Sequence, residues 1–247
     1  QRTVVIGRNQ NAENECRIKA LENDGGHLVR RMSGGGAVYH DLGDANFTFL
    51  VTKGDYDQDK QTEVILRAVR MLGLNVEKNG RNDLTIDGRK FSGHSYYKTG
   101  TKYFHNGTIM VDVDMSQLDR YLNVSPLKLK AKGVKSVRSR VVNLREFLGE
   151  LSIAELYRTL VKAFEEVYGL GSTELGYDDL DEASLAMSMA KFSSPEWILG
   201  DSRPLDISRE ARFDWRTVRL DYSVSADGTA ITEAALWSDG LDAEYLS

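Results

Sequence analysis

The chain has 247 residues, of which 41% are hydrophobic and 28% charged, an ordinary globular composition that excludes a disordered tail, a collagen-like fibre and a disulfide scaffold. With 32 basic and 37 acidic side chains the formal charge is −5, so the chain lacks an overall basic surface for duplex nucleic acid. The single cysteine, Cys16, indicates a reducing compartment. No apolar run in the sequence reaches the roughly 18–20 residues needed to cross a membrane.

The first elements follow from strand composition and helix caps. A strand is predicted at Thr3–Ile6, where β-branched residues gather. Asn11 is suited to cap a helix at Ala12–Asn23, which two glycines follow. A second strand is predicted at Ala45–Val51, and an apolar stripe predicts a helix at Gln58–Leu72.

The middle of the chain continues with strands at Leu84–Ile86 and Lys102–Val113 and with helices at Ser152–Tyr168 and Leu180–Lys191. Strand and helix signals therefore do not alternate strictly. This order predicts an α+β fold of mixed β-sheets with flanking helices, not a doubly wound parallel sheet.

The sequence changes character after residue 200. Gly200–Pro204 has the composition of a linker, and Phe213–Val224 and Ala230–Trp237 read as two strands joined by an Asp-Gly turn. We expect a catalytic domain at residues 1–202 and the beginning of a small, incomplete C-terminal α/β domain at 203–247. The chain opens without Met and stops inside this second domain, so we expect residues to be missing at both ends.

The sharpest local feature is Arg30–Gly43 (RRMSGGGAVYHDLG). Its three successive glycines leave a turn without side chains, so that a ligand can approach several backbone N–H groups. Arg30 and Arg31 add guanidinium groups suited to phosphate or carboxylate. A glycine-rich hairpin with solvated arginines is an equally good interpretation of the composition. The segment is neither a Walker A loop nor a dinucleotide fingerprint, whose third glycine is replaced by Tyr39.

Two other clusters could meet an anionic ligand. Pro126–Arg140 carries six cations, which give a local positive field; a solvated loop or a weak RNA patch is the alternative, although no aromatics are interleaved for base stacking. Asn82 and Asp83 precede a strand and fit an ordinary turn, but an amide and a carboxylate could also read an adenine edge or hold a metal through phosphates. The four histidines show no metal-ligand spacing, and Cys16 has no neighbouring histidine, which favours a structural role.

These clusters, in this order, resemble the lipoate–protein ligase A family of the biotin/lipoate ligase superfamily. The likeness covers nearly the whole chain and is strongest over Gly7–Leu144. A lone triple glycine would be weak, but the ordered set is specific. The matching stretches are Val4–Asn11 (VVIGRNQN), Arg30–Gly43, Asn46–Phe49 (NFTF), Gly80–Leu84 (GRNDL), His105–Thr108 (HNGT) and Ala131–Val141 (AKGVKSVRSRV).

The resemblance implies the fold of that catalytic domain and a reaction in two steps. Lipoate, or octanoate, attacks the α-phosphate of ATP to give lipoyl-AMP and pyrophosphate, and a lysine amine of a lipoyl domain then attacks the mixed anhydride. The implied requirements are ATP, Mg²⁺ and an acceptor, either the glycine-cleavage H protein or an acyltransferase subunit of a 2-oxo acid dehydrogenase. A cytoplasmic location is implied, with no nucleic acid or membrane partner.

The resemblance also implies roles for individual residues. Lys132 is the predicted catalytic residue, because a flexible ammonium can bridge the lipoate carboxylate and the α-phosphate. Asp83 is also the predicted contact for Mg²⁺ through the phosphates. Val38, Phe47 and Phe49 either wall the dithiolane tail or belong to ordinary sheet core. The implied ATP-binding residues are Arg31, Gly36, Ala37, Val38, Tyr39, Asn82, Asp83 and Lys132. The implied lipoate-binding residues are Arg30, Ser33, Gly34, Gly35, His40, Lys132 and Arg138.

Two other functions compete with this interpretation. An acyltransferase on the same fold, which moves octanoyl or lipoyl groups between carrier proteins, commonly uses a cysteine thiolate, and Cys16 lies far in sequence from Lys132. A non-catalytic nucleotide- or RNA-binding module would bind phosphate without forming an acyl product. Biotin ligases are set aside, because their glycine loop is interspersed with arginine.

Overall fold

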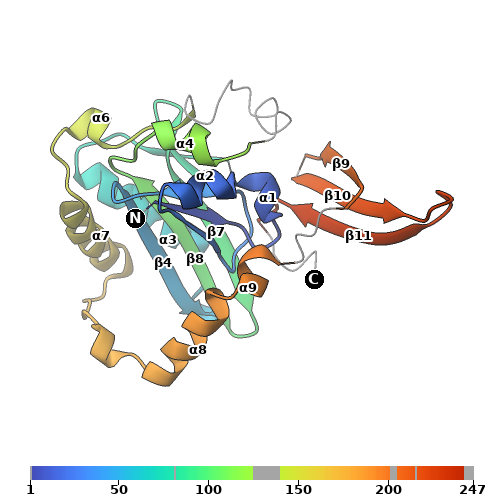
Figure 1. Ribbon diagram of the computed structural model, residues 1–247. Helices are drawn as coiled ribbons and strands as arrows, with labels where there is room; N and C mark the ends of the chain where they lie inside the picture. Colours follow the sequence, from blue (N-terminus) through green and yellow to red (C-terminus); the bar gives the residue numbers. More distant parts are fainter. Residues whose placement is uncertain (1, 81, 125–139, 201–204, 215, 242–247) are drawn as a thin grey trace. The chain divides into compact units, whose positions relative to one another are not determined.

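The computed structural model describes residues 2–80, 82–124, 140–200, 205–214 and 216–241 (Figure 1). The chain forms two compact units. The first unit comprises Gln1–His40, Ser116–Val137 and Ala186–Ser247, and the second unit comprises Asp41–Met115 and Arg138–Leu185. The fold is α+β with several sheets and flanking helices, as the sequence predicts. The domain boundary at residue 202 stays a prediction.

A small mixed sheet organises the first unit. Its central strand is β1 (Thr3–Ile6), which pairs in parallel with β2 (His27–Arg30) and antiparallel with β3 (Val38–His40). Val4 and Ile6 are fully buried on β1. The sequence predicts only the first of these strands, because β2 and β3 are too short to show a period of their own.

The predicted helix over residues 12–23 is two helices, α1 (Ala12–Glu15) and α2 (Ile18–Asn23). Asn11 caps α1 as predicted, accepting N–H bonds from Glu13 and Asn14. The break falls at Cys16, which is extended because it forms an antiparallel bridge with Leu122, just after α4 (Ser116–Tyr121). Pairing with a distant segment therefore interrupts a helix that the local sequence would continue.

The second unit is built on a five-stranded antiparallel sheet in the order β4-β8-β7-β6-β5. One face of this sheet is covered by two helices, α3 (Gln58–Met71) and α7 (Ile153–Tyr168), which also pack on each other. Asp57 caps α3, and Ser152 caps α7. The strands are β4 (Asp44–Thr52), β5 (Glu77–Asn79), β6 (Asp83–Ile86), β7 (Arg89–Thr99) and β8 (Lys102–Met110).

The core of the second unit lies between this sheet and the two helices. Ile65 and Val69 of α3, Phe91 of β7, Ile109 of β8 and Leu156 of α7 are all 1% exposed or less within it. Two predicted candidates for the dithiolane tail also point to this side of the sheet, since the rings at positions 47 and 49 pack against the same core. Of the two interpretations, the structure supports sheet core for both rings.

A three-stranded antiparallel sheet follows α9 (Pro195–Leu199) and belongs to the first unit. Its order is β11-β10-β9, and Gly228 lies in the turn between β10 and β11 with φ +70°, as the Asp-Gly signal predicts. Strand β9 is not predicted from the sequence, because ISREAR is polar and has no clear alternation. The bounds are β9 (Ile207–Arg212), β10 (Thr217–Val224) and β11 (Ile231–Ser238).

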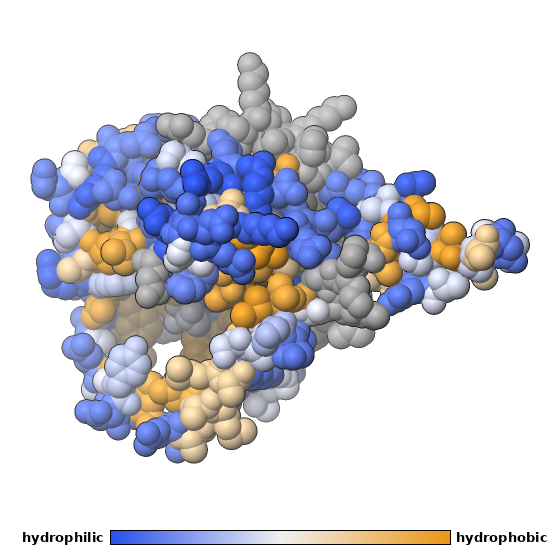
Figure 2. Space-filling model, viewed as in Figure 1, coloured by the Kyte–Doolittle hydropathy of each residue, from blue (hydrophilic) through white to orange (hydrophobic). Residues whose placement is uncertain are grey.

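The remaining helices lie near the surface. They are α6 (Arg145–Leu148) and α8 (Glu182–Phe192), together with 3₁₀ turns at Lys53–Asp55 and Tyr177–Asp179. Helix α8 is almost wholly exposed, including Met187 and Met189, and its pale-orange atoms stand out in Figure 2. Across the described residues, every helix is too short or too polar to cross a bilayer.

Candidate functional site

The glycine-rich loop is positioned by the small sheet of the first unit. Strands β2 and β3 lie on opposite sides of β1, so the segment that joins them, residues 31–37, has to pass the carboxyl end of β1. The Arg31 N–H donates to the Ile6 carbonyl at 3.0 Å, and the Arg8 N–H donates to the Ser33 carbonyl at 2.9 Å. The loop therefore lies directly on the turn that follows β1.

Close backbone contacts explain why glycine stands at several of these positions. A Cβ atom on Gly7 would lie 2.1 Å from the Gly35 carbonyl oxygen, and one on Gly34 would lie 2.2 Å from the Gly240 carbonyl oxygen. Gly35 has φ +96°, which disfavours any L side chain. Gly36 faces open space, with nothing within 4 Å of an added Cβ. The loop thus approaches other backbone closely on one side and is open at Gly36.

Arg31 holds the loop through its own guanidinium group. Nη2 donates to the carbonyls of Gly34 and Gly36 at 2.7 and 2.9 Å, and Nη1 donates to Val5 at 3.2 Å. Burial lowers the pKa of Arg31 to about 10, so the side chain stays charged at neutral pH. Arg31, a predicted ATP-binding residue, therefore also stabilises the conformation of the loop.

Arg30 points to the other side of β2 and is buried. Its guanidinium donates to six backbone carbonyls, which belong to the turn after β1 and to the end of α9. Burial, with a smaller effect from the charge of Arg8, lowers the pKa of Arg30 to about 10. A ligand would have to replace some of these bonds to reach the guanidinium, and the predicted role of Arg30 in lipoate binding stays a prediction.

Arg31 brings positive charge to the loop, and Arg30 brings positive charge to the turn beside it. Among the described residues, no carboxylate forms an ion pair with Arg30 or Arg31, and every hydrogen bond they make is to a neutral carbonyl. A buried charge is normally paired, because desolvation is costly. In a chain of net charge −5, this region is suited to an anion.

The other predicted residues of the motif surround the loop in different ways. Ser33 is completely buried, and Tyr39 is buried with its ring 5.6 Å from that of Tyr121. His40 ends β3 and is half-buried, as are Ala37 and Val38. Gly36 is exposed, and it is the residue of the motif with open space around an added Cβ.

Asn82 and Asp83 lie in the second unit, at the start of β6. The Asn82 amide donates to the His94 carbonyl at 3.3 Å, and the His94 N–H donates to the Asn82 carbonyl at 2.8 Å. Asp83 is buried and forms ion pairs with Lys90, at 2.8 Å, and with Arg140. Neither partner was predicted, although Arg140 is the last cation of the basic segment Pro126–Arg140.

These contacts bear on the predicted metal. Among the described residues, no group of three or more His, Cys, Asp or Glu side chains is arranged to hold a metal ion. The carboxylate of Asp83 is already neutralised by two cations. The described side chains therefore do not fit a protein-held Mg²⁺ site, and the prediction of Mg²⁺ depends on phosphate oxygens alone.

Two predicted residues, Lys132 and Arg138, lie outside the described residues. Their placement on the lipoate and ATP contacts stays a prediction. The described chain resumes at residue 140, where Arg140 bonds to Asp83. Arg140, the last cation of the basic segment, thus contacts one of the predicted nucleotide residues.

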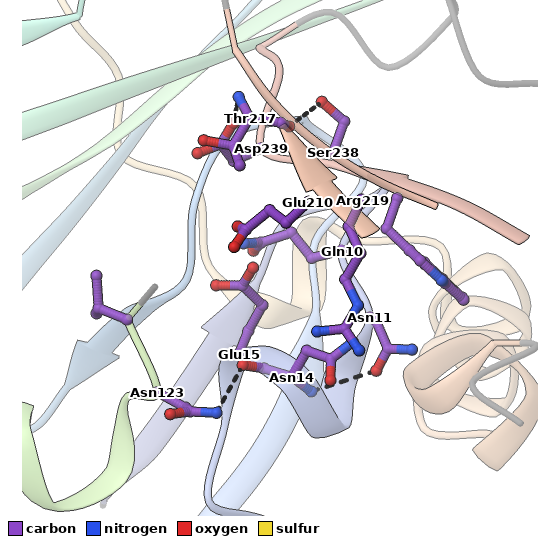
Figure 3. Close-up of a pocket in the computed structure, with 12 residues that line it drawn as sticks. Gln10, Asn11, Asn14, Glu15, Asn123, Glu210, Thr217, Arg219, Ser238 and Asp239 are labelled. Carbon is purple, nitrogen blue, oxygen red and sulfur yellow. Dashed lines mark hydrogen bonds between the residues drawn. The ribbon is translucent and has the colours of Figure 1, made fainter. Parts of the chain in front are cut away.

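The pocket drawn in Figure 3 is a separate feature of the first unit, with a volume of about 220 Å³. It lies between α1 and the C-terminal sheet, and polar side chains point into it from both. None of the predicted site residues lines it. The lining consists of Gln10, Asn11, Asn14, Glu15, Asn123, Val124, Glu210, Thr217, Arg219, Trp237, Ser238 and Asp239.

Cys16 is unsuited to act as a nucleophile. It is 2% exposed, and burial, with a smaller effect from Glu22, raises the pKa of its thiol to about 11. Since the thiolate is the reactive form, the group is almost wholly unreactive at neutral pH. This supports the structural role predicted from its sequence neighbours.

Comparison with known proteins gives one consistent family. Residues 1–165 match the model of the lipoyl protein ligase A/B catalytic domain. A curated protein of Psychrobacter cryohalolentis, described as lipoate-protein ligase A, is 41% identical over 99% of this chain and 74% of its own length.

Solved structures agree in fold. P. falciparum LipL1, solved in complex with lipoate, has a TM-score of 0.82 and 27% identity over 100% of this chain and 72% of its own. A bi-partite lipoate protein ligase of Thermoplasma acidophilum, studied with its E2 lipoyl domain, has a TM-score of 0.71 and 31% identity over 84% of each chain. A lipoate-protein ligase A bound with ATP has a TM-score of 0.69 and 29% identity over 81% of this chain and 83% of its own.

Proposed function

The chain belongs to the lipoyl protein ligase A/B family and is a ligase, and from this premise we propose that it activates lipoate with ATP and attaches it to a lysine of a lipoyl domain. The observation that carries the proposal is the positive charge of Arg31 at the glycine-rich loop, which no carboxylate of the described residues neutralises and which lies in the matched residues 1–165. Relatives solved with lipoate and with ATP support both small-molecule substrates.

The first step joins two anions. A lipoate carboxylate oxygen attacks the α-phosphorus of ATP, and the bond to the β-phosphate oxygen breaks, which releases pyrophosphate. The two reactants repel each other, so the site has to supply positive charge where they meet. Arg31, held at the end of β1 by backbone carbonyls, provides such a charge in a fixed position. Lys132 is the proposed bridge between the carboxylate and the α-phosphate.

The second step transfers the acyl group. A lysine amine attacks the carbonyl carbon of lipoyl-AMP, AMP leaves, and the amine loses a proton as the amide forms. This step needs no protein nucleophile, because the mixed anhydride is already activated. A relative studied with its E2 lipoyl domain supports a lipoyl domain as acceptor. The glycine-cleavage H protein and the acyltransferase subunits of 2-oxo acid dehydrogenases are the proposed carriers.

An acyltransferase that works through a thioester is disfavoured by the state of Cys16. A thioester intermediate requires a reactive thiolate, whereas burial keeps this thiol protonated and out of contact with solvent. The chain has no other cysteine. Release of pyrophosphate that depends on both ATP and lipoate separates the two functions, since a transferase would not produce it.

The test of the proposal is Lys132→Ala. We expect lipoate-dependent pyrophosphate release to fall at least about a hundredfold, because the variant loses the charge that brings the two anions together. Lys128→Ala, in the same basic segment, is the matched control and should retain activity. Near-normal pyrophosphate release by Lys132→Ala would refute the role of the lysine. Mass measurement of candidate carriers after incubation with ATP, Mg²⁺ and lipoate then identifies the acceptor.

A further inference from the structure

Helix α9 depends on side chains elsewhere in the first unit for its position. It has five residues, Pro195–Leu199, which is too short to be stable alone. Ser194 caps its first turn, but its last carbonyls have no donors within the helix. The helix contacts β2, and Arg30 at the end of that strand supplies the missing donors.

The guanidinium of Arg30 binds two separate segments at once. On one side Nε donates to the carbonyls of Trp197 and Ile198, both at 3.0 Å, and Nη2 donates to Leu199 at 3.3 Å. On the other side Nη1 donates to three carbonyls of the turn after β1, those of residues 7, 8 and 10, at 3.1, 2.9 and 2.6 Å. Only a planar fork with five N–H groups can serve both sets together.

Trp197 closes the connection from the opposite side. Its indole N–H donates to the backbone carbonyl of Arg30 at 2.8 Å. The guanidinium of Arg8 lies 4.3 Å from the centre of the indole ring, and the ring of Phe192 meets it edge-on at 5.0 Å. Arg30 and Trp197 thus hold each other through reciprocal bonds, 167 residues apart in sequence.

The turn held by Arg30 is the same turn on which the glycine-rich loop packs. Gly7 faces the Gly35 carbonyl so closely that a Cβ would not fit, and the Arg8 N–H donates to Ser33. A shift of the turn would therefore shift the loop. We propose that Arg30 and Trp197 form a clasp that sets the position of the glycine-rich loop, with Arg30 as a positioning residue. The inference rests on the proposed function of that loop as the substrate-binding site.

Arg30→Lys tests the clasp. An ammonium group cannot bond to both segments, so the free loop should depart from its binding position, and bound substrate should restore it. The free energy needed to restore the loop then weakens substrate binding. We expect the KM for ATP to rise about tenfold while kcat changes little. Arg120→Lys is the matched control, because Arg120 also joins distant segments of the first unit by bonding to Asp24. Its side-chain contacts among the described residues include none of residues 31–37.

Amide hydrogen exchange distinguishes a positioning role of Arg30 from a merely structural one, because a structural role would not make exchange at α9 depend on ATP. Because coupling is reciprocal, ATP should slow exchange over residues 195–199 in the wild type and in Arg120→Lys, but not in Arg30→Lys. Trp197→Phe keeps an aromatic ring but loses the indole N–H bond, and it should give an intermediate KM. This variant is used if Arg30→Lys does not fold.

Two results would overturn the clasp. One is a normal KM in Arg30→Lys together with a loss of thermal stability similar to that of Arg120→Lys. The other is exchange at α9 that does not respond to ATP in the wild type. Absence of lipoate-dependent pyrophosphate release in the wild type would instead refute the proposed function, and the response of α9 to ATP would still decide the clasp.

Discussion

Single residues of the glycine-rich loop have different reasons to be glycine. The sequence suggests that the bare backbone is there for a ligand, and Gly36 is open in that way. At Gly34, however, the space is filled by the backbone of Gly240, and the Gly35 N–H donates to the same residue at 2.8 Å. Sequence reasoning finds the segment but cannot assign its glycines, because the carbonyl that meets them lies 205 or more positions away.

This difference predicts opposite results for two neighbouring substitutions. Gly35→Ala should destabilise the fold by about 1–2 kcal/mol and weaken binding of ATP and lipoate, since alanine resists a φ of +96°. Gly36→Ala should fold with unchanged stability, because nothing lies within 4 Å of its added Cβ. Urea unfolding and isothermal titration measure the two effects. Equal stability of the two variants would contradict this account of the loop.

Helices and strands with their own caps and hydrophobic patterns were predictable from the sequence. Elements that depend on contacts with residues far away in the sequence were not. Helices α3 and α7 have polar caps and apolar stripes, and their predicted bounds agree with the structure within one residue or so. The predicted helix over residues 12–23 fails at Cys16, where strand-like pairing with Leu122 takes over. Helix α9 was missed for a related reason, since its stability comes from Arg30 and not from its own five residues.

The second unit also contains a buried polar chain that the spacing of the histidines does not reveal. His94 Nδ1 and His105 Nε2 are 2.8 Å apart, and His105 Nδ1 lies 3.1 Å from the Gln61 side-chain oxygen. The amide oxygen only accepts, so His105 donates to it and accepts from His94. Ser92 donates in turn to His94 Nε2, at 3.1 Å. The chain satisfies both rings while they are neutral, and it joins β7 and β8 to α3.

Acidification should therefore weaken the fold. Burial, followed by the charge of Lys78, lowers the pKa of His105 to about 4, and burial lowers the pKa of His94 well below 6.5. Between pH 6.5 and 4 the unfolded chain binds protons that the folded chain does not, so stability falls as the pH is lowered through this window. Each such proton contributes a slope of about 1.4 kcal/mol per pH unit.

The variant that tests this is His105→Gln, which can accept and donate but does not titrate. We expect urea unfolding between pH 7 and pH 4.5 to show a shallower loss of stability than in the wild type. His27→Gln is the control, because His27 is exposed on β2 and its replacement should leave the slope unchanged. A wild-type stability that stays level down to pH 4.5 would contradict the neutral chain.

At the scale of the whole molecule, the local charge near the glycine-rich loop is opposite in sign to the net charge of the chain. The chain is acidic, yet Arg30 and Arg31 lie in the first unit without carboxylate partners among the described residues. The sequence indicates this asymmetry through its motifs, and the structure adds that both guanidinium groups are held by backbone carbonyls. The contribution of Lys132 and Arg138 stays a prediction, since both lie outside the described residues.

Some predicted ATP-binding residues lie in the first unit and others lie in the second. The effect of ATP on amide exchange can therefore be measured separately in each unit. We expect ATP to slow amide exchange at residues 31–39 in the first unit and at Asn82 and Asp83 in the second. At a hundred times its Kd the ligand should stabilise the folded chain by about 3 kcal/mol. Protection confined to the first unit would remove Asn82 and Asp83 from the ATP contacts. GTP at the same concentration is the control for base recognition.

The interruption between α1 and α2 has a practical consequence for experiments on this chain. It places the sulfur of Cys16 under neighbouring segments, where the thiol is both shielded and protonated. Maleimide reagents should consequently not react with the Cys16 thiol in the folded chain. A cysteine introduced at an exposed site, such as Met187 of α8, would then take up a fluorophore selectively, so that distances during catalysis can be followed without first removing the natural thiol.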